Sequence, residues 1–410
     1  MTCCDDPKEH LLSIDEALQI LIQQAQCKSA TEMVSLDSAL GRVVAQNIYS
    51  NIDVPPNANS AMDGYAMRWQ DYQSGLNIPI SQRIAAGSTG HHLVAGTLAR
   101  IFTGAEIPMG ADTVVKQEDT IVTDKGVEIT SAPTQGEHIR PAGQDIKKGG
   151  LLISQGSLLT PRHIGVLASV GCAKVPVFEK LKVCLVNTGD ELQMPGEQAQ
   201  AGKIYNSNHF SIKGYLQTLQ CQVTSVEALE DTQKAVYEAL KEASNKADLI
   251  ITTGGVSVGE EDYVKDVVAQ LGQLKLWRLA IKPGKPLAFG DVQGTHFIGL
   301  PGNPVAALVT FLLLARPFIK GLQGTPYKAA QEFPVMANFA SKVNNKRQVY
   351  LQSNLHFADG QVLATPLAKQ SSGALSTTIE ASGLLVIPPN TLVKKGDKLQ
   401  FIAYNELFDS

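Results

Sequence analysis

Residues 181–320 alternate short apolar runs with segments of helical apolar spacing, and this alternation restricts the possible folds more than any other feature of the chain. An apolar run at 183–186 precedes a segment in which Ile212, Leu216 and Leu219 share one face. The same order recurs with apolar runs at 223–226, 249–251 and 296–298 and helical spacing at 232–243 and 264–271. Strands that alternate with helices form a mostly parallel sheet covered on both faces. We therefore expect a central three-layer α/β domain.

The regions on both sides of this segment have a different pattern of residues. The chain has 410 residues, more than the roughly 250–300 at which single cores stop growing. Two regions carry short β-branched runs between Gly, Pro and Asp turns, which is typical of small β domains. Length alone predicts two to four domains, and the pattern divides the chain into an N-terminal mixed linking domain at 1–50 and 147–179, a β-rich insertion domain at 51–146, an α/β domain at 180–328, and a C-terminal domain at 329–410 that is a β-barrel or a sandwich.

Two helices are predicted near the N-terminus. Ser13 and Glu16 have the spacing of a capping box and should begin the first helix. A second, short helix should end at Gly41.

Several classes of protein are disfavoured by composition. The net charge is −4 and no broad basic field is present, so nucleic acid is not an expected partner. The longest apolar run, near 305–315, is shorter than the roughly 20 residues that span a bilayer and predicts a buried helix rather than a membrane segment. The polar residues 1–10 do not resemble a secretory signal, and the six cysteines form no C-x-x-C pair. A cytoplasmic protein with free thiols is expected.

Three glycine-containing turns follow the predicted strands, at 187–191, 252–262 and 299–304. Ligands of open parallel sheets bind at the carboxyl ends of the strands, where these turns should meet. Asn303 should cap a helix with Pro304 at its first position, which leaves free N–H groups at that edge. One such turn is ordinarily structural, but three in one sheet predict a phosphate or oxyanion site.

The middle turn differs from the phosphate-binding loop of nucleotide hydrolases. Gly254 and Gly259 have the required spacing, but Glu260 and Glu261 stand where that loop needs Lys and Ser or Thr. Acidic side chains beside an anion are explained by a bridging cation, and oxygen ligands with a phosphate suit Mg²⁺. Glu191 and Asp262 are the predicted metal ligands, although the acidic run could equally favour a helix N-terminus.

A basic segment lies in the same region of sequence. Lys282 and Lys285 flank a Pro-Gly turn, and Arg278 precedes them by four residues. These cations could hold the oxygens of a phosphate or another oxyanion, although an isolated turn of this kind is more often a solvated surface.

Three polar turns mark the β-rich insertion, and they contain Asp63, Thr103 and Asp145. Such turns are mostly structural, and spacing alone does not say that they meet. His138 has no partner His at ligand spacing, so a metal site there is not expected.

Six motifs together identify a family. They are NSAMDGYAM at 59–67, GEHIRPAGQDI at 136–146, NTGDEL at 187–192, TTGGVSVGEEDYVK at 252–265, IKPGKPLAFG at 281–290 and GLPGNPVAA at 299–307. In these motifs, and over essentially its whole length, the chain resembles the MoeA family of molybdopterin molybdenumtransferases. It is similar also to the E domain of gephyrin.

The resemblance implies an elongated homodimer of four-domain subunits. Its α/β domain would be MogA-like and bind the pterin, and the insertion of the opposite subunit would close the cleft. The implied reaction takes adenylylated molybdopterin and molybdate, requires Mg²⁺, releases AMP and leaves molybdenum on the dithiolene sulfurs. The adenylyltransferase of the same pathway and apo-molybdoenzymes are the implied protein partners.

Site residues follow from the resemblance by motif position. The implied catalytic residues are Asp63, Thr103, Asp145, Glu191, Asp262 and Lys282, with Glu191 and Asp262 as metal ligands. The implied substrate-binding residues are Gly254, Gly255, Ser257, Arg278, Lys285, Pro301, Asn303 and Pro304. Two positions depart from many relatives: Arg278 stands where some have Lys, and Ala306 where many have Ser, which removes a hydroxyl contact to the anion.

Two alternatives stay open. A molybdopterin adenylyltransferase resembles the α/β domain alone, and the two β domains count against it. A non-catalytic scaffold, as in gephyrin, would not need the acidic residues and lysines of the cleft motifs, which are present here.

Overall fold

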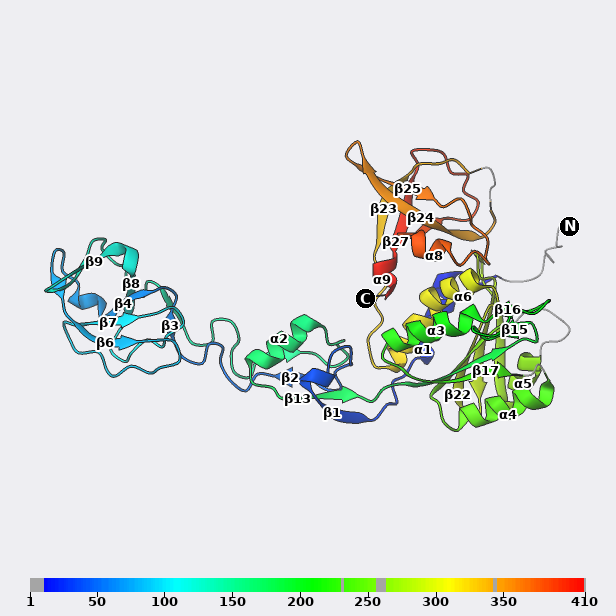
Figure 1. Cartoon of the computed structure of the whole chain (residues 1–410), viewed down its shortest axis with the longest axis horizontal. Helices are drawn as coiled ribbons and strands as arrows, with labels where there is room; N and C mark the ends of the chain where they lie inside the picture. Colours follow the sequence, from blue (N-terminus) through cyan, green and yellow to red (C-terminus); the bar gives the residue numbers. More distant parts are fainter. Residues whose placement is uncertain (1–10, 230–231, 256–262, 342–344, 409–410) are drawn as a thin grey trace.

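The computed structural model describes residues 11–229, 232–255, 263–341 and 345–408. Ser257 and Asp262, two of the predicted site residues, lie outside the described residues. Figure 1 shows an elongated molecule with the β-rich insertion at one end, the linking region in the middle, and the α/β sheet and C-terminal barrel together at the other end.

The α/β region is built on one six-stranded sheet of order β17-β14-β18-β22-β21-β19. Its parallel strands are β17 (Gln222–Leu229), β14 (Lys182–Thr188), β18 (Leu249–Thr253) and β22 (Thr295–Leu300). The last two, β21 (Pro286–Val292) and β19 (Gly272–Arg278), run antiparallel to their neighbours and were not predicted. Short connections such as the one between β21 and β22 can join only antiparallel strands, so this edge could not continue the parallel pattern.

Helices bury apolar residues on both faces of this sheet. On one face, α4 (Gln233–Ser244) and α5 (Tyr263–Leu271) pack with Ile250 and Phe297. On the other, α1 (Ile14–Gln24), α3 (Ser207–Thr218) and α6 (Pro304–Thr310) pack with Ile251 and Ile298. The capping box of α1 is present, with the Ser13 hydroxyl accepting from Glu16 N–H. The predicted face of α3 is confirmed at Ile212 and Leu216, which are fully buried.

A longer helical segment than expected follows the last turn. It runs from Pro304 to Leu322 through α6, a π-helical turn η4 (Phe311–Ala315) and α7 (Arg316–Leu322). With 19 residues and a mean hydropathy of 1.8 it has the length and composition of a membrane span, but 83% of it is buried inside the structure. The prediction of a buried helix here is confirmed, and the predicted length was too short.

The linking region packs two small antiparallel strand pairs against one helix, and each pair joins strands that are far apart in the sequence. Strand β1 (Thr31–Ser35) pairs with β13 (Lys174–Phe178), and β2 (Ile48–Tyr49) with β12 (Leu151–Ile153), while α2 (Pro161–Ser169) covers them. The second predicted helix is wrong, because only the 3₁₀ turn η1 (Leu36–Ser38) forms there before Gly41 adopts a left-handed backbone.

The insertion contains a four-stranded sheet, a three-stranded sheet and a small pair. The sheet orders are β6-β7-β4-β8, β5-β10-β9 and β11-β3. Their strands are β3 (Asn59–Ser60), β4 (Gly64–Met67), β5 (Asn77–Ile78), β6 (Ile80–Ile84), β7 (Leu98–Ile101), β8 (Thr113–Lys116), β9 (Thr120–Thr123), β10 (Gly126–Ile129) and β11 (Ile139–Arg140). The β-rich character expected from the β-branched runs is present.

The C-terminal region forms a closed five-stranded barrel. The strand order β24-β25-β23-β27-β26 returns to β24 through the pairing of β24 with β26. The strands are β23 (Glu332–Ala337), β24 (Gln348–Ala358), β25 (Gln361–Pro366), β26 (Gly383–Ile387) and β27 (Lys398–Ala403), with short helices α8 (Thr377–Glu380) and α9 (Tyr404–Phe408). A sixth strand, β20 (Ile281–Lys282), comes from the α/β region and pairs with β24.

Candidate functional site

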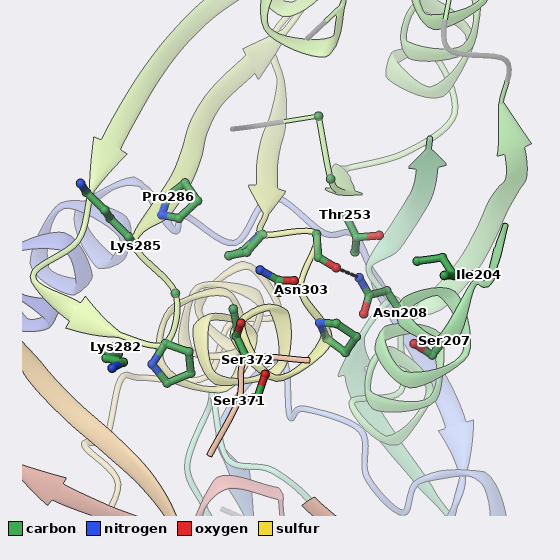
Figure 2. A pocket seen from close by; sticks show the side chains of 18 of the residues that line it. Ile204, Ser207, Asn208, Thr253, Lys282, Lys285, Pro286, Asn303, Ser371 and Ser372 are labelled. Atoms are coloured by element: carbon green, nitrogen blue, oxygen red, sulfur yellow. Dashed lines mark hydrogen bonds between the residues drawn. The ribbon is translucent and has the colours of Figure 1, made fainter. Parts of the chain in front are cut away.

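A cavity of about 900 Å³ opens at the carboxyl ends of β14, β18 and β22 (Figure 2). Its walls come from the α/β sheet on one side and from the barrel on the other. This is the edge at which open parallel sheets bind ligands.

The three predicted turns meet in this cavity as far as they are described. The first contributes Thr188 and Glu191, the second Thr253, Gly254 and Gly255, and the third Pro301, Gly302, Asn303 and Pro304. Gly254 N–H donates to the Leu300 carbonyl at 3.1 Å, which joins the second turn to the third. Gly254 and Gly255 have φ values of 86° and 65°, a left-handed backbone that glycine adopts without strain.

The N-terminus of α6 points toward the cavity but is partly occupied by protein. Asn303 is the N-cap residue, and its side chain makes no capping hydrogen bond. The N–H of Val305 donates to the Ser372 carbonyl of the barrel at 2.8 Å. On the opposite wall, Asn208 Nδ2 donates to the Gly302 carbonyl at 2.7 Å, a contact visible in Figure 2. The third turn is therefore held from both sides.

Positive charge dominates the described lining. Lys282 and Lys285 come from the basic turn, and Arg347 from the start of β24, against the single carboxylate of Glu191. Strand β20 places Lys282 opposite Val349 of the barrel, and Arg347 donates to the Ile281 carbonyl at 3.3 Å. The barrel thus fixes the basic turn, and the cluster can attract an anion with more than one charge.

Arg278 does not belong to this cluster. It is a described residue, but it is not among the residues that line the cavity. It ends β19 opposite Pro286, and its carbonyl accepts from Leu12 N–H at 2.9 Å. The geometry gives no support to its predicted role as a direct substrate contact.

An apolar wall faces the polar edge. Strands β15 (Leu192–Gln193) and β16 (Ile204–Tyr205) form a small parallel pair beside the cavity. Ile204 and Tyr205 are exposed on this wall, and the Tyr205 hydroxyl donates to the Glu197 carbonyl at 2.9 Å. The hydrogen bond fixes the ring, so a flat apolar group could pack here.

In the insertion, Asp63 and Thr103 are brought together. The carboxylate of Asp63 accepts from both the N–H and the hydroxyl of Thr103, each at 2.7 Å. These two hydrogen bonds, backbone first, hold the pKa of Asp63 below its ordinary value. Asp145 lies elsewhere, where its N–H donates to the Val54 carbonyl at 2.9 Å.

The insertion lies at the far end of the molecule from the cavity, with the linking region between them (Figure 1). Within one chain, Asp63 and Thr103 therefore do not approach Lys282 or Glu191. The predicted site is divided into two separate parts.

Metal ligation is sparse in the described part of the chain. No group of three or more His, Cys, Asp or Glu side chains there has the arrangement of a metal site. Glu191 lines the cavity, while Asp262, the other predicted ligand, lies outside the described residues. Mg²⁺ keeps several waters and is commonly held by one or two carboxylates together with substrate phosphates, and Glu191 is the carboxylate in the described lining that could serve as such a ligand.

Sequence reasoning missed the contribution of the barrel. The cavity is also lined by Arg347, Gln370, Ser371 and Ser372, and Figure 2 shows the two serines at its lower edge. Gln370 is held by Gln352, to whose carbonyl its Nε2 donates at 2.8 Å. The polar stretch at 369–373 between apolar segments was the available signal, but nothing local to it indicates that it faces the α/β sheet.

Three family descriptions match consecutive parts of the chain. Residues 12–171 match "MoeA N-terminal region (domain I and II)", residues 184–321 match "Probable molybdopterin binding domain", and residues 335–404 match "MoeA C-terminal region (domain IV)".

Whole proteins match over nearly the full length. A molybdopterin molybdenumtransferase of Haemophilus influenzae is 37% identical over 97% of this chain and 100% of its own length. One from Nostoc is 33% identical over 90% of this chain and 87% of its own length. The crystal structure of a molybdopterin biosynthesis MoeA protein from Pyrococcus horikoshii superposes with a TM-score of 0.82, at 26% identity, over 96% of this chain and 100% of that one. With its cavity, its cationic turn and its four-part architecture, the chain belongs to the MoeA family of molybdopterin molybdenumtransferases.

Proposed function

We propose that the protein inserts molybdenum from molybdate into adenylylated molybdopterin in a Mg²⁺-dependent reaction that releases AMP. The observation that carries this proposal is a cavity lined by three cations, Lys282, Lys285 and Arg347, and by the carboxylate of Glu191. The relatives named as molybdopterin molybdenumtransferases support the same reaction.

The three cations would bind the oxygens of molybdate and of the phosphate anhydride. Charge-assisted hydrogen bonds to such oxygens are about twice as strong as neutral ones. As the anhydride breaks, negative charge grows on the AMP phosphate, and the same cations would stabilise it. The exposed wall of Ile204 and Tyr205 would pack against a ring of the substrate.

Glu191, together with Asp262, would hold Mg²⁺ or its waters beside the phosphates. The bound ion would neutralise negative charge on the phosphate anhydride. A carboxylate such as that of Glu191 repels a phosphate anion beside it, so a cation between the two would make their proximity favourable.

A second copy of the chain would complete the site. The insertion carries Asp63, Thr103 and Asp145 but lies at the far end of its own chain from the cavity. In a two-fold dimer, the insertion of one subunit can reach the cavity of the other, where Asp63 and Asp145 would orient substrate or a metal-bound water. A homodimer in the cytoplasm, receiving its substrate from the adenylyltransferase and passing cofactor to apo-molybdoenzymes, is part of this proposal.

AMP release tests the reaction directly. The purified protein is incubated with adenylylated molybdopterin, MgCl₂ and molybdate, and AMP is measured by chromatography. We expect AMP release that depends on molybdate. Lys282→Met should lower this activity at least about 100-fold. Lys246→Met is the control and should not change it, because Lys246 lies on the surface just after α4, where it pairs with Glu242. No AMP release from the parent protein would contradict the proposal. Formation of adenylylated pterin from molybdopterin and Mg-ATP would favour the adenylyltransferase instead.

Complementation tests the shared site. Asp63→Asn and Lys282→Met proteins, each inactive alone, are mixed, unfolded and refolded together. Random pairing puts about half of the subunits into mixed dimers with one intact site each, so about one quarter of the parent activity should return. Absence of recovery from refolded, dimeric mixtures would show that each chain uses its own insertion.

A further inference from the structure

A buried hydrogen-bonded chain lies directly beneath one wall of the cavity. It joins His209 of α3, Asn187 at the end of β14 and Thr253 at the end of β18. His209 and Asn187 are 0% exposed and Thr253 is 3% exposed. The site residues inferred from sequence and the cationic cluster do not include any of the three.

The chain has a direction. The Oδ1 of Asn187 lies 3.0 Å from Nδ1 of His209, so that nitrogen carries a proton and donates it. The Nδ2 of Asn187 donates to the Thr253 hydroxyl, whose oxygen therefore acts as acceptor. The proton of the Thr253 hydroxyl is then left for another partner, and it donates to no acceptor within the described ranges of the chain.

The side chain that carries this remaining proton lies in the wall of the cavity. Thr253 lines the cavity, and Figure 2 shows its side chain beside Asn208 and the third turn. Thr252, the preceding residue, must point to the other face of the sheet because side chains alternate along a strand. Thr252 is fully buried, its hydroxyl has no hydrogen-bond partner among the residues that the structure describes, and it does not line the cavity.

We propose that Thr253 donates its hydroxyl hydrogen bond to an oxygen of a bound tetrahedral oxyanion, and that Asn187 and His209 are positioning residues that keep the hydroxyl in the donating direction. The proposal rests on the proposed function, because it concerns the phosphate of the adenylylated pterin or molybdate itself. Both ligands present the same oxygen acceptors.

A directed donor adds what the cations cannot. Lys282, Lys285 and Arg347 attract any anion, since their interaction depends mainly on charge and distance. A hydroxyl held by a rigid neighbour instead binds an oxygen most tightly at one position. A hydrogen bond to a charged group also contributes more than one between neutral groups.

Binding measurements on three variants test the role of Thr253. Thr253→Val removes the hydroxyl at nearly constant shape, Thr253→Ser keeps it, and Thr252→Val is the matched control on the other face. Affinities for AMP and for molybdate are measured separately by titration calorimetry. For at least one ligand, Thr253→Val should bind about 10- to 100-fold more weakly, while Thr253→Ser and Thr252→Val stay within about threefold of the parent. The ligand that loses affinity identifies the oxyanion.

A double-mutant cycle tests the positioning residues. Asn187→Leu removes the amide that orients the hydroxyl and should weaken the same ligand in the parent, but add little in the Thr253→Val protein. A purely structural effect of Asn187 would instead lower affinity equally in both backgrounds and would contradict the positioning role.

The outcomes separate this inference from the proposed function. If the parent binds AMP and molybdate and releases AMP, but Thr253→Val behaves as Thr252→Val does, the inference is wrong and the function stands. If Thr253→Val weakens binding of AMP while the parent lacks molybdate-dependent AMP release, the donor is correct and the proposed reaction is wrong. Thermal unfolding of each variant, compared with Thr252→Val, shows whether a loss of binding comes from loss of the fold.

Discussion

Gly284 lies at the centre of the basic turn, and its replacement by alanine should damage both stability and the cavity. Its φ of 107° is in the left-handed region, which costs a residue with a Cβ about 1–3 kcal/mol. A Cβ there would lie 2.5 Å from the hydroxyl oxygen of Thr310, a contact that something must move to relieve. Overpacking of this kind costs about a further 1–3 kcal/mol. We therefore expect Gly284→Ala to destabilise the α/β region by about 2–6 kcal/mol.

Two further variants separate the two causes. Gly294 also has a left-handed backbone, with φ of 84°, but an added Cβ would meet nothing within 4 Å, so Gly294→Ala should show only the backbone cost. Thr310→Ala removes the obstructing hydroxyl, which is buried and has no hydrogen-bond partner in the described part of the chain, and should itself change stability little. In that background, Gly284→Ala should recover about 1–3 kcal/mol of its loss.

The assay uses a local fluorescent probe. Trp277 is buried in the α/β core and Trp69 lies in the insertion, so urea unfolding in a Trp69→Phe background reports on the α/β region. AMP release is measured on the same proteins, and Thr310→Ala should restore part of the activity lost in Gly284→Ala. Equal losses for Gly284→Ala and Gly294→Ala, or no recovery with Thr310→Ala, would refute the packing argument.

Further predictions concern charge and metal. Thr103→Val should raise the pKa of Asp63 toward the ordinary 3.8, measured by carboxyl carbon NMR, because one of its two stabilising hydrogen bonds is lost. The lowered pKa means that Asp63 favours the folded state above its ordinary pKa and that this contribution disappears as the pH falls through the folded value; an unchanged titration in the variant would contradict the assignment. Arg347→Met should weaken molybdate binding at least about tenfold in calorimetry, whereas Lys346→Met, which is exposed and outside the cavity, should not. Chelation of divalent ions by EDTA should abolish AMP release and added MgCl₂ should restore it; full activity in EDTA would remove Mg²⁺ from the mechanism.

Local patterns account for the parts of the fold that were predicted well. The capping box at Ser13 and Glu16 and the buried face of α3 depend on residues three or four positions apart, which the sequence displays directly. The meeting of three turns followed from a general property of parallel sheets rather than from any distance in the sequence.

Long-range pairing accounts for the parts that were not predicted. The pairing of β20 with β24 brings together residues 66 positions apart, and no local feature of either strand indicates that they pair. Arg347 and Ser372 were missed for the same reason. Arg278 was expected beside Lys282 and Lys285 but does not line the cavity, because charge spacing does not give side-chain direction: Trp277 beside it is buried in the core, and neighbours on a strand point to opposite faces.

The pairing of β20 with β24 also determines at which point of synthesis the cavity can be completed. Domains fold from the N-terminus as the chain leaves the ribosome, and the strands of the α/β sheet have all emerged once Leu300 is free. Lys282 then has no strand beside it until β24 follows, and the N–H of Val305, once it emerges, has no carbonyl partner until Ser372 follows. A nascent chain can therefore possess the complete sheet without the finished cavity. A cut in the connection at 323–331 that let the barrel separate would return the mature protein to that immature state.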